Sequence, residues 1–152
     1  MVDGGRRNLD GTPSDPDLPA GDQADALAAE EARERYRDEP MAPIEVRGSI
    51  ADLLGPTERL LAVRNDARYD RRQEAEGSRG PGLSGDLYLT SSRLILLGRF
   101  DLTFDLEEIE EIDLFGDRLR LMTGKGAGLS LDVDQPRLLR VEIGAARMGA
   151  RA

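Results

Sequence analysis

The chain has 152 residues, enough for one domain with a hydrophobic core of ordinary size. Acidic residues outnumber basic ones by 30 to 21, and the net charge of −9 disfavours nucleic acids and anionic lipid surfaces as general partners. The sequence contains no cysteine and no histidine, which excludes disulfides, thiolate chemistry and the most common general base and zinc ligand. We therefore expect no enzymatic activity, no metal site and no cofactor.

The composition also indicates a compartment and a source. No apolar run approaches the roughly 18–20 residues that span a bilayer, and the first residues lack the apolar segment of a signal peptide. We expect a cytoplasmic protein. Lys125 is the sole lysine among many arginines, and together with frequent Ala, Gly and Asp this is typical of a GC-rich bacterial gene.

Residues 1–43 form an acidic segment of low complexity with 5 arginines and 11 acidic residues. Residues 1–21 carry few apolar side chains and recurring prolines, so we expect them to be disordered. Residues 22–38 have apolar side chains at helical spacing and are predicted to form a helix. Because that apolar stripe is mostly alanine, we interpret the helix as a solvated spacer, with a docking element as the alternative.

Residues 44–152 are predicted to form the folded domain. Residues 49–54 suit one helical turn, and residues 58–64 suit a first strand. Residues 65–82 are polar and contain several glycines, which predicts a long exposed loop.

The stretch 85–98 is typical of a β-hairpin around which later strands are added. Leu87 and Leu89 alternate with polar residues, and Leu94 and Leu96 lie in a short apolar run beyond a polar turn. Further alternating segments predict four more strands, which brings the total to seven. These segments are residues 102–106, 109–114, 118–123 and 129–133.

The chain ends with a change from strand to helix periodicity. Pro136 suits the first turn of a helix, and Asp132 or Asp134 is the predicted cap. An apolar face follows at helical spacing. Its residues are Leu138, Val141, Ala145 and Met148, with Leu139, Ile143 and Ala146 beside them.

Seven antiparallel strands closed by a C-terminal amphipathic helix resemble the PH-like superfold. Within it, the segments Glu-Arg-Leu-Leu-Ala (58–62), Gly-Asp-Leu-Tyr-Leu-Thr-Ser-Ser-Arg-Leu-Ile-Leu (85–96) and Leu-Glu-Glu-Ile-Glu-Glu-Ile (106–112) resemble bacterial PH-like and GRAM-type domains. The resemblance implies a mainly β protein: a seven-stranded antiparallel sandwich or open barrel, capped by a C-terminal α-helix and preceded by a disordered tail. It also implies a binding module, because most members bind lipids or proteins without catalysis.

One candidate site is basic. In PH domains that bind phosphoinositides, the basic site lies in the loop that corresponds to residues 65–82, which implies an anion or lipid-headgroup site here. Five carboxylates within residues 64–93 leave that region a net charge of only +1, so we favour a solvated loop of mixed charge. The residues of this candidate site are Arg68, Arg71, Arg72 and Arg93.

A second candidate is the acidic run within residues 105–113. Carboxylate clusters hold Mg²⁺ or Ca²⁺, or act as acid and base in glycoside hydrolysis, but no other part of either kind of site is present in the sequence. We interpret the run as a solvated strand face, with an interaction edge for a basic partner as the alternative.

The sequence therefore predicts a non-catalytic binding or scaffold module whose partner is a protein. The alternative is a peripheral membrane module that binds anionic lipid headgroups through the arginines of residues 64–93. An enzyme that uses Glu108 or Glu110 is a distant third hypothesis.

Overall fold

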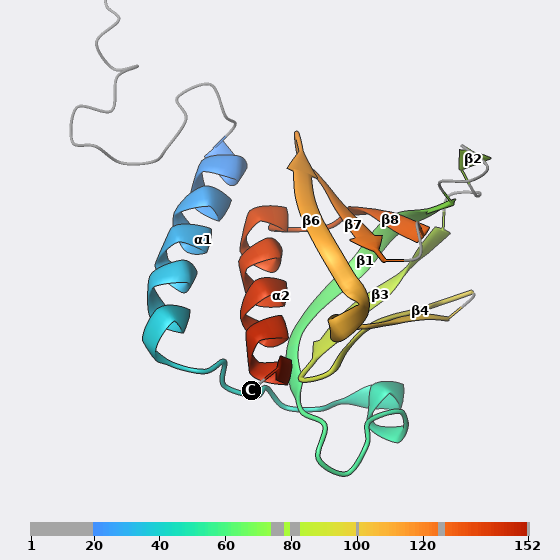
Figure 1. Ribbon diagram of the computed structural model, residues 1–152, viewed down its shortest axis with the longest axis horizontal. Coiled ribbons are helices and arrows are strands. Elements are labelled where there is room, and N and C mark those ends of the chain that lie inside the picture. Colours follow the sequence, from blue (N-terminus) through green and yellow to red (C-terminus); the bar gives the residue numbers. More distant parts are fainter. Residues whose placement is uncertain (1–19, 74–77, 80–82, 100, 125–126, 152) are drawn as a thin grey trace, which may run out of the picture.

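The protein, seen in a computed structural model, consists of one antiparallel sheet and two helices (Figure 1). The structure describes residues 20–73, 78–79, 83–99, 101–124 and 127–151. The helices are α1 (Ala20–Asp38) and α2 (Pro136–Arg151), and the strands are β1 (Leu60–Gln73), β2 (Ser78–Arg79), β3 (Leu83–Thr90), β4 (Arg93–Gly98), β5 (Leu102–Asp105), β6 (Ile109–Phe115), β7 (Arg118–Thr123) and β8 (Ala127–Asp132), with 3-10 turns at Gly48–Asp52 and Leu106–Glu108. In this part of the chain, no helix is long and apolar enough to cross a membrane. The disorder predicted for residues 1–21 falls outside the described residues, except that Ala20 and Gly21 begin α1.

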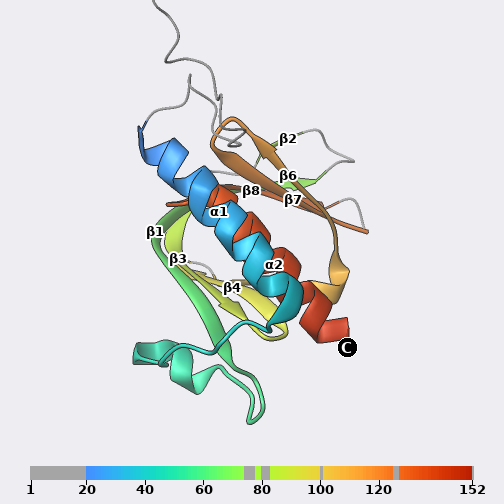
Figure 2. The same ribbon diagram turned by 90° about the vertical axis from the view of Figure 1, so that its left-hand side faces the viewer.

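The strands follow the spatial order β5-β4-β3-β1-β8-β7-β6, with the short β2 paired to β1. All pairings between neighbours are antiparallel, and the sheet is open because β5 and β6 are its two edges. Helix α2 packs against this bent sheet, and α1 packs on the outer side of α2 (Figure 2). The predicted architecture, an open antiparallel sheet of seven main strands with a C-terminal helix, is confirmed.

Strand β1 joins the two halves of the sheet. It pairs with β3 from Leu60 to Tyr69 and with β8 from Arg68 to Gln73. The prediction of a loop from residue 65 onward was wrong, because the strand continues to Gln73. Ala67 and Tyr69 are buried in the core with two-residue spacing, and the polar residues between them hide this alternation.

The predicted hairpin lies at the centre of the core. Its four leucines, Leu87, Leu89, Leu94 and Leu96, are completely buried and pack with side chains from β7, β8 and α2. Burial of each leucine contributes about 1.5–3 kcal/mol, so this hairpin is a main source of stability in a core with few aromatic residues.

Helix α2 meets the sheet with only one part of its predicted apolar residues. Leu139, Ile143 and Ala146 are buried in the core, whereas Met148 is 71% exposed. The predicted apolar stripe lies about 150° around the helix axis from this buried face. The helix therefore has two apolar faces, and only one of them is buried against the sheet.

A buried ion pair holds α2 against β1. The Arg64 guanidinium contacts the Glu142 carboxylate at 2.8 Å and also donates to the carbonyl oxygen of Asp134 at 2.9 Å. Burial raises the pKa of Glu142 above its usual value, although the charge and hydrogen bond of Arg64 act in the opposite direction. The pair therefore fixes the position of α2 along the strand, although burial of two charges contributes little net stability.

Helix α1 docks on α2, so the interpretation of this helix as a solvated spacer was wrong. Its buried residues are Asp25, Ala29 and Ala32. The two carboxylate oxygens of Asp25 accept hydrogen bonds from the backbone N–H groups of Arg137 and Leu138, at 2.8 and 3.0 Å. Asp25 thus caps the N-terminus of α2, which corrects the prediction that Asp132 or Asp134 would do so.

The other two predicted caps have different contacts. Asp132 pairs with Arg118 at 2.8 Å, and the backbone carbonyl of Asp134 receives Arg64. An aspartate 112 residues distant from its N–H partner leaves no trace in the helical periodicity. The division of the chain between residues 43 and 44 stays a prediction.

Candidate functional site

Arg93, one of the predicted anion-binding residues, belongs to a polar cluster centred on Glu58. Its guanidinium donates to both Glu58 carboxylate oxygens at 2.9 and 2.7 Å, and to the carbonyl oxygen of Leu53 at 2.8 Å. The hydroxyls of Thr90 and Ser92 also donate to Glu58. These hydrogen bonds, led by that from Arg93, lower the pKa of Glu58 to about 2. The cluster fastens the segment before β1 to the β3–β4 turn.

The structure separates Arg93 from Arg68. Thr90, at the β3–β4 turn, is opposite Leu60, whereas Arg68 is exposed near the other end of β1, opposite Ser84 and Asp132. The eight-residue spacing from Leu60 to Arg68 corresponds to about 26 Å along the strand. Because the side chains of residues 71 and 72 are outside the described part, the anion site predicted from the four arginines remains a prediction.

The acidic run lies on the 3-10 turn before β6 and along β6 itself, which is an edge strand. Its glutamates are exposed, and among the described residues no group of three or more acidic side chains is arranged to hold a metal ion. Charged side chains on an edge strand discourage pairing with the edges of other sheets. This placement supports the interpretation of the run as a solvated face.

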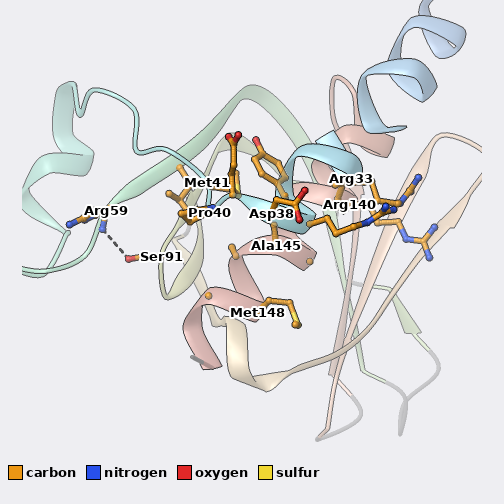
Figure 3. A pocket seen from close by; sticks show the side chains of 17 residues that line it. Arg33, Asp38, Pro40, Met41, Arg59, Ser91, Arg140, Ala145 and Met148 are labelled. Atoms are coloured by element: carbon orange, nitrogen blue, oxygen red, sulfur yellow. Dashed lines mark hydrogen bonds between the residues drawn. The ribbon is translucent and has the colours of Figure 1, made fainter. Parts of the chain in front are cut away.

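A groove of about 1060 Å³ lies along α2 between Arg140 and Gly149. It is lined by the last turns of α1 with the linker that follows, by the start of β1 with the β3–β4 turn, and by α2 residues from Arg140 to Gly149; we call it the α2 groove. Met148 and Ala145 project from α2 on one side, and Pro40 and Met41 lie across from them (Figure 3).

The α2 groove has an apolar floor. Val141, Ala145 and Met148 of the second α2 face line it, together with Leu61 of β1. A side chain added at Gly144 would meet no atom within 4 Å of its Cβ, so the groove is open at that position. Three of the four residues of the apolar stripe predicted on α2 therefore line this groove.

The charged residues of the α2 groove are mostly arginines. Arg33 pairs with Glu30 at 2.8 Å. Among the described side chains, Arg37, Arg59 and Arg140 have no carboxylate within ion-pair distance. Figure 3 shows Arg59 at one end of the groove and Arg33 with Arg140 at the other. The groove thus combines an apolar floor with arginines at both ends, and the carboxylates of Asp38 and Glu39 lie on its α1 side.

Sequence reasoning missed this groove because its walls are distant in the chain. Arg59 donates its backbone N–H to the Ser91 hydroxyl at 3.0 Å, which joins two of the lining segments. One feature of the sequence could have indicated the groove: the apolar pattern of α2 is wider than one buried helix face requires. The acidic composition of the chain also concealed a local excess of arginine.

No protein-family model matches the sequence, and no curated protein matches it. Several solved structures are similar to it, among them the following two. The crystal structure of the C-terminal domain of an unknown protein from Leishmania infantum is 15% identical, with a TM-score of 0.49, over 66% of this chain and 92% of that chain. The pleckstrin homology (PH) domain of USP37 is 16% identical, with a TM-score of 0.40, over 57% of this chain and 95% of that chain. Assignment to a bacterial GRAM-type family remains a prediction.

Proposed function

We propose that this chain is a non-catalytic binding or scaffold module that engages a protein partner. The observation that carries the proposal is the α2 groove, whose apolar floor continues along a helix face left uncovered by the sheet. A concave apolar site with a few polar groups around it is the usual form of a ligand-binding site. Its span from α1 to β1 suits a peptide segment, because peptides dock in grooves along helices.

The alternative, a peripheral membrane module, depends on Arg68, Arg71, Arg72 and Arg93. Arg93 supports it weakly, because its guanidinium already contacts Glu58 on two oxygens. Arg68 is exposed and belongs to no ion pair among the described residues, which keeps it as the strongest member of that site. The proposal of a protein-binding module includes a cytoplasmic location.

Site-specific cross-linking tests the proposal. A photoreactive amino acid replaces Met148 of the groove or, as the matched control, Leu27 of α1; these side chains are 71% and 52% exposed, and Leu27 does not line the groove. We expect cross-links from position 148 to one protein in cells of the source organism, and none to that protein from position 27. Equal cross-linking from both positions, or cross-links to lipid only, would contradict a protein partner in the groove.

A further inference from the structure

We propose that the α2 groove binds an acidic amphipathic peptide segment of the partner protein. The apolar side chains of this segment contact Val141, Ala145 and Met148, and its carboxylates pair with the groove arginines. This inference rests on the proposed function and specifies the chemistry of the partner.

The apolar part of the argument comes from helix α2. Val141, Ala145 and Met148 are separated by four and three residues, so they form one continuous stripe on the helix surface. Met148 is 71% exposed, and methionine is a flexible side chain that adapts to different partner shapes. Gly144 lies within the same surface, and the absence of a side chain there lets a ligand approach the helix backbone closely.

The charge argument comes from a comparison of arginines within the molecule. Arg64, Arg93 and Arg118 each contact a carboxylate at 2.7–2.8 Å. In a chain with a net charge of −9, carboxylates are plentiful, yet the described structure places none within ion-pair distance of Arg37, Arg59 or Arg140. All three line the α2 groove. A carboxylate is the planar ligand that the guanidinium fork fits best.

The spatial pattern specifies the order of groups in the ligand. Arg59 and Arg140 lie at opposite ends of the groove, and Met41 faces the α2 stripe between them (Figure 3). A matching segment carries carboxylates on both sides of a central apolar group. An amphipathic helix presents such a pattern through side chains spaced three and four residues apart.

A membrane surface fits this site less well. The whole chain has a net charge of −9, so a broad anionic bilayer is repelled at long range, whereas a short peptide meets only the groove, where four arginines outnumber the carboxylates of Asp38 and Glu39. Val141 and Ala145 are half-buried between α1, the linker and β1, where a peptide can enter more easily than a flat surface.

Selection from a random peptide library tests the inference with the full chain. The library is displayed on phage, and selections run in parallel on the wild type and on Gly144→Leu, which places a side chain on the groove floor. We expect peptides that are enriched on the wild type alone, with Asp or Glu flanking Leu, Ile, Met or Phe. The affinity of such a peptide is expected to fall about tenfold in Gly144→Leu and to stay unchanged in the control Gly21→Leu.

Charge reversal separates acidic recognition from simple hydrophobic binding. Arg140→Glu is expected to weaken binding of the selected peptide about tenfold, whereas Arg68→Glu, which changes the net charge equally at an exposed site outside the groove, leaves it unchanged. High salt is expected to weaken wild-type binding several-fold. Equal effects of the two reversals would overturn the assignment of the carboxylate contacts.

The outcomes distinguish this inference from the proposed function. If Gly144-dependent peptides emerge but are basic or uncharged, the acidic ligand is wrong and the protein-binding proposal stands. If no Gly144-dependent peptide emerges and the chain sediments with phosphatidylserine vesicles in a manner that requires Arg68, both are overturned. Self-association that Gly144→Leu abolishes would also overturn the acidic ligand, because a second copy would then occupy the groove.

Discussion

The two ends of the α1–α2 pair differ in how their charged groups are compensated. At one end, Asp25 is 3% exposed and caps α2, while Arg137 contacts Asp22, Asp25 and Asp117 at 3.3–3.7 Å. At the other end, Met148 is 71% exposed, and the α2 groove is open at Gly144. We call these the closed end and the open end. The difference indicates that the closed end fixes the helices and that the open end is available for binding.

The largest expected effect concerns the Glu58 cluster, which holds the β1 wall of the open end. Because Arg93 and the hydroxyls lower the pKa of Glu58 to about 2 from 4.5, its ionised form stabilises the fold fully above pH 4.5 and ceases to do so as the pH falls towards 2. A shift of this size corresponds to about 3 kcal/mol in the free energy of unfolding.

Urea denaturation of the wild type and of Glu58→Gln at a series of pH values checks this. The difference between the two unfolding free energies is expected to be largest at neutral pH and to decrease between pH 4.5 and 2. Subtracting the unfolding free energy of the variant from that of the wild type removes the contributions of the other carboxyl groups. A difference that is independent of pH would mean that the charge of Glu58 does not stabilise this wall.

The second largest expected effect is a loss of stability on substitution of Asp25 at the closed end. Asp25→Ala leaves the backbone N–H groups of Arg137 and Leu138 without their acceptor, and it is expected to cost about 2 kcal/mol in the free energy of unfolding. Asp25→Asn retains one acceptor oxygen and is expected to cost less. Chemical denaturation measures both. A decrease of less than about 0.5 kcal/mol in the free energy of unfolding of Asp25→Ala would show that the two helices are only weakly attached to each other.

The open end is expected to respond to substitution in the opposite direction. Gly144→Leu replaces a helix-interior glycine at a position with free space, so we expect a stability gain of about 0.5–1 kcal/mol. The same variant is expected to lose partner binding. A variant that is more stable and binds less separates the binding role of the groove from its structural role. Destabilisation would show that the space at Gly144 is filled in solution.

The smallest expected effect is that of Arg140→Ala on stability. Since Arg140 has no carboxylate within ion-pair distance among the described residues, its removal is expected to change the free energy of unfolding by less than about 0.5 kcal/mol. Thermal unfolding of the variant beside the wild type measures this. A cost as large as that of Asp25→Ala would mean that Arg140 has a structural partner and is not reserved for a ligand.

The sequence predicted the parts of this fold whose contacts are local and periodic. The hairpin of β3 and β4 was predictable because Leu87 and Leu89 alternate with polar residues beside an apolar run. The continuation of β1 was missed because its polar residues resemble a loop, although Ala67 and Tyr69 keep the two-residue period. The pairing of those residues depends on β3 and β8, which are distant in the chain.

The helices show a second limit of sequence reasoning. Periodicity identified an apolar pattern in α2 but did not show which stripe meets the sheet, because both stripes are apolar. Docking of α1 depends on one buried carboxylate, Asp25, and on two alanines that allow close approach. The α2 groove combines four chain segments that only the tertiary fold brings together, so the apolar pattern of α2 alone does not predict it.

Amide hydrogen exchange with and without a selected acidic peptide tests the central claim most directly. The account predicts that the peptide slows exchange in α2 around residues 140–149, in residues 37–41 and at the start of β1, and that Gly144→Leu removes this protection. Protection confined to the β6 edge, or to β1 around Arg68, would contradict the assignment of the α2 groove as the binding site.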